Sequence, residues 1–174
     1  MEKLNSKTLR TYKPTEKNLG EIKRNPIVFV LDEILDTFNI GSMFRLADAV
    51  AAQKMYLCGH METPPSSRIH KAAVGTESWV PWEHRSSTLK VVKKLKSQNF
   101  YVVAAEQDER SISLFEFKPH FPLAIILGHE SKGIKPEVLN QVDTIVELPM
   151  LGINNSFNVW GTAAVLAYRS VEKL

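Results

Sequence analysis

Residues Pro26 to Gly59, PIVFVLDEILDTFNIGSMFRLADAVAAQKMYLCG, contain the pattern that decides the fold. The first six residues, 26–31, are a short apolar run typical of a buried strand, and residues 54–59 form a second such run. Between them, apolar residues at 40, 43, 44, 47, 50 and 51 follow the helical period and predict a helix over 39–52. A strand, a helix and a strand in this order are typical of α/β domains.

The same alternation continues along the rest of the chain. Residues 60–68 include Pro64 and Pro65 and are expected to form a loop. Apolar runs predict strands over 79–84, 100–105, 122–127 and 144–149, and Pro81 favours a sheet edge for the first of these. Helices are expected over 87–99, over 136–142 and from 157 to the end. The sequence therefore predicts one α/β domain with a mostly parallel sheet flanked by helices.

Composition favours a soluble protein of the cytoplasm. The chain has 174 residues, of which 44% are hydrophobic and 24% charged, as expected for one globular domain. Cys58 is the only cysteine, so no disulfide can form within the chain and a reducing compartment is expected. Residues 1–10 contain no apolar signal sequence, and no apolar run approaches the roughly 20 residues that span a bilayer.

Positive charge is concentrated at the N-terminus. Residues 1–25 contain seven Lys or Arg and three Glu, whereas the net charge of the whole chain is only +3. The seven are Lys3, Lys7, Arg10, Lys13, Lys17, Lys23 and Arg24. A basic arm over 1–25, ahead of a near-neutral domain over 26–174, fits a polyanionic partner. The alternative is a solvated tail without a binding role.

Polar residues with a regular spacing follow the first strand. Asn39, Gly41 and Arg45 form the pattern N-x-G-x-x-x-R at the start of the expected helix. Asn39 is a candidate cap for this helix, and Gly41 leaves room for a second backbone or a phosphate. Arg45 lies off the apolar stripe, which favours either a phosphate-binding role or simple solvation.

Two further polar segments follow late strands. Gly128, Glu130 and Gly133 form G-x-E-x-x-G, which differs from a nucleotide-binding P-loop because Ile134 stands where that motif requires Lys. Before the last helix, four polar residues surround one Phe, namely Asn154, Asn155, Ser156 and Asn158. One cap needs only one such side chain. The surplus favours a loop that binds a polar ligand, with capping alone as the alternative.

In this order, the three motifs resemble those of the SpoU, or TrmH-type, RNA ribose 2′-O-methyltransferases of the SPOUT class. The third motif appears as Leu148-Pro149-Met150, Gly152, Ser156 and Asn158, and the segment HKAAVGTES at 70–78 is also similar to the family. The resemblance covers about residues 26–172. The chain departs from the family at Phe157, where Leu is usual, and at Trp160 and Gly161, where small or medium polar residues are common.

The resemblance implies a C-terminal trefoil (α/β) knot, S-adenosyl-L-methionine as cofactor, no metal, and a homodimer with active sites near its interface. It implies methyl transfer to a ribose 2′-hydroxyl, with tRNA expected rather than rRNA because the chain is little more than a catalytic domain. The alternative is an RNA-binding module with weak or no catalysis, suggested by Trp160.

The resemblance also assigns the site residues. The catalytic group comprises Arg45, Asn39, Glu130, Ser156 and Asn158, and the cofactor-binding group comprises Ala105, Leu127, Gly128, Leu148, Met150 and Phe157.

Overall fold

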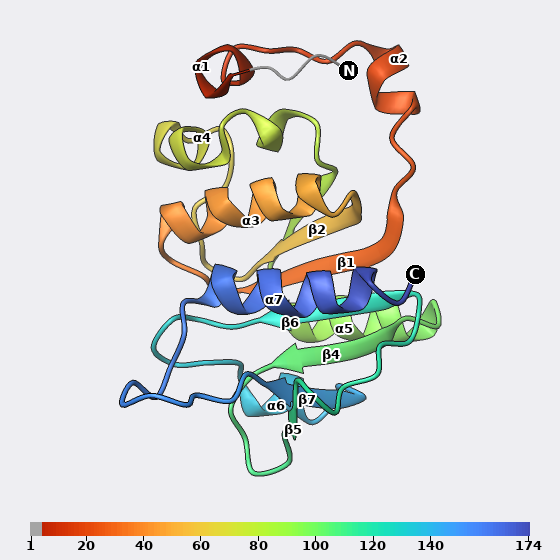
Figure 1. The fold of residues 1–174 in the computed structure, drawn as a ribbon, viewed down its shortest axis with the longest axis vertical. Helices are drawn as coiled ribbons and strands as arrows, with labels where there is room; N and C mark the ends of the chain where they lie inside the picture. The colour runs from red at the N-terminus through yellow and green to blue at the C-terminus, as the bar shows by residue number, and fades with distance from the viewer. Residues whose placement is uncertain (1–4) are drawn as a thin grey trace.

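A single seven-stranded sheet forms the centre of the molecule in the computed structural model, which describes residues 5–174 (Figure 1). The strands are β1 (Asn25–Asp32), β2 (Ala52–Cys58), β3 (Trp82–Arg85), β4 (Tyr101–Ala105), β5 (Ile112–Ser113), β6 (Leu123–Leu127) and β7 (Thr144–Glu147). They lie in the order β3-β2-β1-β6-β4-β7-β5, and every strand pairing in the described residues is parallel. The predicted α/β class and parallel sheet are therefore confirmed, and β3 lies at an edge as Pro81 indicated.

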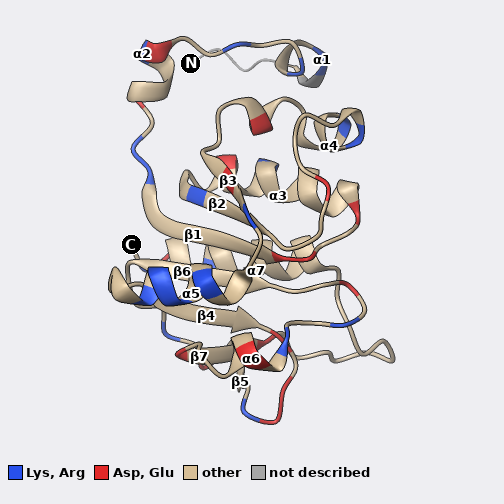
Figure 2. Ribbon diagram, turned by 180° about the vertical axis from the view of Figure 1, so that it is seen from behind, with Lys and Arg blue, Asp and Glu red and all other residues tan. Residues whose placement is uncertain are grey.

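Helices cover both faces of the sheet. They are α1 (Ser6–Leu9), α2 (Glu16–Gly20), α3 (Thr37–Ala49), α4 (Ser67–Ala73), α5 (Thr88–Ser97), α6 (Pro136–Leu139) and α7 (Val159–Val171), with a 3-10 turn, η1, at Thr76–Ser78. Helices α3 and α7 lie on one face, and α5 lies on the other, as the opposite views in Figures 1 and 2 show. No helix in residues 5–174 is long and apolar enough to cross a membrane. The trefoil knot stays a prediction.

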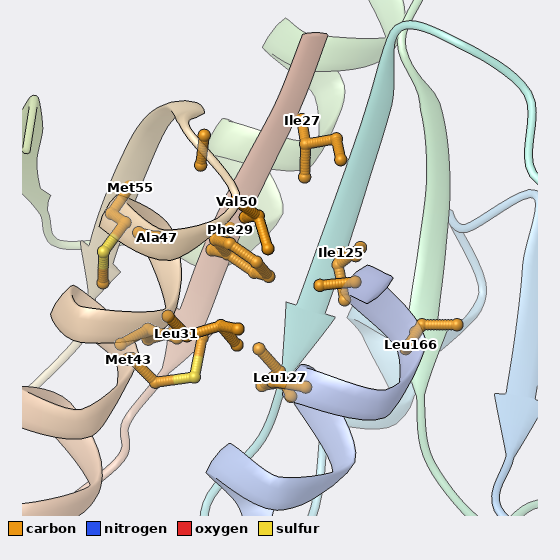
Figure 3. Close-up of a cluster of buried hydrophobic side chains, with 14 of the residues drawn as sticks. Ile27, Phe29, Leu31, Met43, Ala47, Val50, Met55, Ile125, Leu127 and Leu166 are labelled. Atoms are coloured by element: carbon orange, nitrogen blue, oxygen red, sulfur yellow. The ribbon is translucent and has the colours of Figure 1, made fainter. Parts of the chain in front are cut away.

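The larger hydrophobic core lies between the sheet and the α3–α7 layer (Figure 3). Successive side chains of a strand point to opposite faces, so Phe29 and Leu31 enter this core while Val30 packs toward α5. Leu166 of α7 and Met43 of α3 complete it, and both are fully buried. Deep burial on both faces explains why β1 and β6 read as continuous apolar runs.

Helices α3 and α4 differ from the sequence prediction in ways that bear on the site. Helix α3 begins before Asn39, and its cap is Asp36, whose Oδ1 accepts a hydrogen bond from the Phe38 N–H at 2.8 Å. Asn39 is therefore not the cap, and its side chain is free for another role. Helix α4 was missed, because only Ile69 and Ala73 of its seven residues are buried and the apolar period is too short to detect.

Gly41 provides the close approach between α3 and α4. A Cβ at this position would lie 2.5 Å from the Ala72 Cβ and 2.7 Å from the Ile69 carbonyl oxygen. Side chains larger than hydrogen would therefore push α4 away from α3. Of the two neighbours expected for Gly41, a second backbone or a phosphate, the structure shows the backbone.

The described part of the basic arm is docked on the domain. The Arg24 guanidinium donates to the carbonyl oxygens of Ala52 and Trp79, both at 3.0 Å, and Tyr12 packs edge-on against the Trp79 ring. Burial lowers the pKa of Arg24, while nearby Asp48 raises it in part. Arg24 therefore serves the fold, and whether the arm over 1–25 also binds a polyanion stays a prediction. Lys3, also counted in the arm, lies outside the described residues.

Candidate functional site

A cavity of about 700 Å³ opens beyond the carboxyl ends of β4, β6 and β7. Two loops, 128–134 and 148–158, form its other walls. All six residues assigned to the cofactor line it: Ala105, Leu127, Gly128, Leu148, Met150 and Phe157. Glu130, Ser156 and Asn158 line it as well. The structure thus gathers residues from the second and third motifs around one hollow at the edge where parallel sheets usually bind ligands.

Gly128 and Gly133 allow the first loop to fold tightly. A Cβ on Gly128 would lie 2.5 Å from the carbonyl carbon of Gly133 and 2.6 Å from the Ile134 nitrogen. Gly133 has a φ of +66°, and its N–H donates to the His129 carbonyl at 2.9 Å. The two glycines therefore close a narrow turn, and the turn carries Glu130 away from β6 toward the start of α3.

The Glu130 carboxylate binds the segment that precedes α3. Its Oε1 accepts hydrogen bonds at 3.0 Å from the Asp36 N–H and from Asn39 Nδ2, and its Oε2 accepts from the Leu35 N–H at 3.2 Å. Partial burial raises the pKa of Glu130, but the bonds from Asn39 and from these backbone N–H groups outweigh burial and lower it overall. Glu130 therefore stays ionised, and the strength of its bonds depends on that charge.

Asn39 and Asn158 extend this contact to the last helix. Asn158 Nδ2 donates to Asn39 Oδ1 at 3.1 Å, and Asn158 Oδ1 accepts from the Trp160 N–H at 3.0 Å as the cap of α7. The groups at the two ends fix the direction of every hydrogen bond in this series. A carboxylate can only accept, so Asn39 presents its amide nitrogen to Glu130; a helix N–H can only donate, so Asn158 presents its oxygen to α7. Three motifs far apart in the sequence thus meet in one chain of hydrogen bonds.

Glu106 is a cavity residue that the sequence analysis missed. Its Oε2 accepts from the Ile134 N–H at 2.9 Å, and its Oε1 accepts from the Gln107 N–H at 3.0 Å. Gln107 in turn donates to the Asn155 carbonyl at 2.7 Å, which ties the two loops together. The available signal was a carboxylate placed directly after β4, at the same edge as the other motifs.

Phe157, rather than Trp160, belongs to the cavity wall. A Cβ on Gly161 would lie 2.5 Å from the Phe157 ring, so the glycine provides the space that this ring occupies. Trp160 is not among the residues that line the cavity. The unusual Phe and Gly therefore form a matched pair, and the indole next to them does not shape the pocket.

Arg45 is the site candidate that the structure does not bring to this cavity. It lies on the exposed side of α3, and neither a hydrogen bond nor an ion pair within residues 5–174 involves its guanidinium. Asn39, Glu130, Ser156 and Asn158 come together, whereas Arg45 points elsewhere. In the same residues, no group of three or more His, Cys, Asp or Glu side chains is placed to hold a metal ion.

Sequence comparison gives matches over most of the chain. The model of the SpoU rRNA Methylase family matches residues 26–168. The chain is 28% identical to the putative TrmH family tRNA/rRNA methyltransferase YacO of Bacillus subtilis, over 90% of this chain and 63% of that protein. It is 26% identical to the 23S rRNA (guanosine-2'-O-)-methyltransferase RlmB of Ralstonia nicotianae, over 89% of this chain and 62% of that protein.

Structural comparison agrees with the sequence matches. The fold is similar to that of an AdoMet-bound rRNA methyltransferase from Sinorhizobium meliloti, with a TM-score of 0.81 at 20% identity, over 95% of this chain and 60% of that one. The chain therefore spans between 60% and 63% of the length of these three proteins.

Proposed function

The chain belongs to the SpoU rRNA methylase family, and from this premise we propose that it is an RNA methyltransferase that modifies ribose 2′-hydroxyls in the cytoplasm, with S-adenosyl-L-methionine as methyl donor. The observation that carries the proposal is the hydrogen-bonded chain from Glu130 through Asn39 to Asn158, whose two ends line a cavity of about 700 Å³. A cavity of this size suits a cofactor or a drug-sized ligand.

The cavity residues fit S-adenosyl-L-methionine. Leu127, Leu148, Met150 and Phe157 provide apolar walls for an adenine ring, and Gly128 keeps its backbone accessible because no Cβ covers it. Ala105 lies beside Leu127 in the sheet register and extends the same wall. We assign cofactor binding to these residues.

Substrate alignment is the task left to the polar residues. When bound, the cofactor supplies a methyl group made electrophilic by the sulfonium, so the protein must position the ribose oxygen and help to remove its proton. We assign Ser156, which is exposed at the cavity, to substrate contact. Glu130 and Asn39 act as positioning residues, because their polar atoms are already engaged with the loops that they hold.

Arg45 contacts the substrate RNA in this proposal. A guanidinium offers five N–H donors and no acceptor, so Arg45 is a poor proton acceptor. It can instead hold a phosphate of the RNA and stabilise the developing alkoxide. We expect Arg45→Ala to lose most methyl transfer and Arg45→Lys to recover little, since Lys lacks the planar two-pronged grip.

A homodimer explains why Arg45 lies outside the cavity of its own chain. Leu35 and Phe38 are more than half exposed, and they lie within four residues of Asn39, whose side chain contacts Asn158. Trp160 and Tyr168 are also exposed, and they belong to α7, which lies on the same face of the sheet as α3. Exposed patches of this kind mark association sites. We propose that a second copy covers this surface and that Arg45 serves the cavity of the partner.

Mixed dimers test this arrangement. Co-expression of Arg45→Ala with Asn158→Ala subunits creates, in the mixed dimer, one site without either change if Arg45 acts across the interface. We then expect recovery of up to about half the activity of the native dimer. If Arg45 acts within its own chain, both sites are damaged and the mixed dimer stays as inactive as its parents, which would refute the arrangement.

The function itself is tested by cofactor binding and by mapping of methyl groups. Calorimetry should show S-adenosyl-L-methionine binding to the purified protein, and no binding at millimolar ligand would favour the RNA-binding module. Comparison of 2′-O-methyl positions in total RNA, with and without the gene, should show one lost modification. We expect it in tRNA; loss from rRNA would correct the substrate class, and no loss in either would reject the proposed function.

A further inference from the structure

Helix α4 presents two cations on one exposed face. Arg68 and Lys71 are three residues apart, which places them side by side on a helix, while Ile69 and Ala73 face the core. No ion pair in the described residues involves either side chain. The nearby acids are engaged elsewhere, since Glu62 accepts from the Ser66 hydroxyl and Glu77 contacts the His70 ring. Arg68 and Lys71 are therefore exposed cations that form no direct ion pair within residues 5–174.

The charge on α4 continues onto the basic arm. Gly75 lies two residues after the end of α4, with a φ of +93°, and a Cβ there would lie 2.5 Å from the Leu9 carbonyl oxygen at the end of α1. The ends of α1 and α4 therefore approach each other, and α1 contains Lys7 and is followed directly by Arg10. Figure 2 shows Lys and Arg on both helices at this end of the molecule.

The charge also continues toward Arg45. Helix α4 packs against Gly41 of α3, and Arg45 follows Gly41 by four residues, which is about one helical turn. The Arg45 side chain therefore projects from α3 at the edge of the α3–α4 contact. A single surface results, in which α4 lies between the arm and the arginine assigned to the substrate.

We propose that this surface, formed by α1, α4 and Arg45, binds the backbone of the substrate RNA, with Arg68 and Lys71 as phosphate-binding residues. The inference rests on the proposed function and adds two residues to it. Spread-out cations without acidic partners suit a polyanion, whose bound counterions are released on binding. Arg68 and Lys71 lie outside the cofactor cavity, so they act on RNA affinity and not on cofactor affinity.

A pair of double variants tests the proposal. Arg68→Ala with Lys71→Ala removes the α4 charges, and Lys90→Ala with Lys93→Ala is the matched control. The control residues are also exposed and three apart, but they lie on α5, across the sheet. Both changes remove two positive charges. The probes are labelled bulk tRNA and an rRNA transcript, and binding is measured over a range of salt concentrations.

For the α4 variant, we expect the slope of log K against log salt to lose roughly 1.4 to 1.8, at about 0.7 to 0.9 per phosphate contact. Over the tenfold range from 1 M to 0.1 M salt, this loss of slope corresponds to an affinity that is weaker by roughly 25- to 60-fold at 0.1 M salt. The control should change little, and both variants should bind S-adenosyl-L-methionine with native affinity, which also shows that they fold.

Equal effects of the two double variants would overturn the inference, because the binding would then follow net charge alone. Native RNA affinity in the α4 variant would also overturn it. The failure of the proposed function looks different: in that case the unsubstituted protein itself methylates neither RNA probe.

Discussion

Asp32 and Glu130 occupy similar places in the sheet, but their pKa values are shifted in opposite directions. They lie at and just beyond the carboxyl ends of β1 and β6, which are neighbours in the sheet. Burial raises the pKa of Asp32, and the hydroxyl of Thr88, which donates to Oδ1, only partly opposes this. Its Oδ2 has no hydrogen-bond partner in the structure. Glu130 accepts three hydrogen bonds from nitrogen donors, and its pKa is lowered.

The difference shows that a strand end alone does not make a binding site. The hollow beside Asp32 measures about 190 Å³ and contains the ion pair of Glu33 and Lys135, at 2.8 Å. The cavity beside Glu130 is more than three times larger, and it is bordered by loops that hydrogen bonds hold in place. N–H donors to a carboxylate, rather than its position after a strand, therefore distinguish the candidate site from its neighbour.

The largest expected effect comes from a change that displaces the Glu130 loop. Gly128→Ala places a Cβ 2.5 Å from the Gly133 backbone, and backbone cannot move aside as a side chain can. Overpacking of this kind costs about 1–3 kcal/mol, so we expect affinity for S-adenosyl-L-methionine to fall by up to roughly 100-fold in calorimetry. Gly152→Ala is the control, since nothing lies within 4 Å of a Cβ there. Similar affinity in the two variants would contradict the tight-turn account.

Asn158→Ala should have the next largest effect. The change removes the cap of α7 and leaves Asn39 Oδ1, on a side chain that is only 2% exposed, without its donor. A lost cap costs about 1 kcal/mol and an unpaired buried acceptor about 1–3 kcal/mol. Because Asn158 itself is exposed, we expect the lower part of the summed range, a fall in the free energy of unfolding of about 2–3 kcal/mol. Denaturant titration measures this. Asn154→Ala is the control, because within residues 5–174 the Asn154 side chain forms one hydrogen bond, from the exposed Ser156 N–H. A comparable loss in that variant would remove the special role of Asn158.

The sequence was sufficient for the class of the fold because buried parallel strands and amphipathic helices leave clear periodic signals. It also placed Gly128 and Gly133 correctly at the ends of a tight loop. It did not predict the link between Asn39 and Asn158, which are 119 residues apart, because hydrogen-bond partners across a fold leave no local pattern. The same reason explains the missed role of Glu106. Helix α4 escaped detection because one buried turn is too short for a helical period.

Glu130→Gln tests the lowered pKa directly. A carboxylate with a lowered pKa in the fold stabilises the protein above its ordinary pKa of about 4.3, and this contribution is lost as pH falls through the folded value. We expect the variant to be less stable at pH 7 by about 1 kcal/mol, a modest figure because the side chain is partly exposed to solvent. Unfolding measured from pH 7 to pH 3 should show the two proteins converging at low pH. A constant difference across this range would show that the charge of Glu130 contributes nothing.

Asp32→Asn should have the smallest effect and the opposite pH dependence. A carboxyl group with a raised pKa in the fold stabilises the protein fully below its ordinary value of about 3.9, and the native protein loses this contribution as pH rises through the folded value. Asn cannot ionise, so the variant should show a flatter pH profile. Its Oδ1 keeps the bond from Thr88, but its amide nitrogen replaces an atom that has no partner.

Two effects of Asp32→Asn oppose each other near neutral pH. The change removes a buried charge, which is favourable, and it introduces an unpaired amide donor, which is unfavourable. The net change in the free energy of unfolding should therefore stay below about 1 kcal/mol at pH 7, with the native protein gaining on the variant as the pH falls. Affinity for S-adenosyl-L-methionine should not change, since Asp32 does not line the larger cavity. If the native protein instead loses stability relative to the variant as the pH falls, or if the variant loses cofactor affinity, Asp32 belongs to the same functional class as Glu130 and the contrast between the two strand ends disappears.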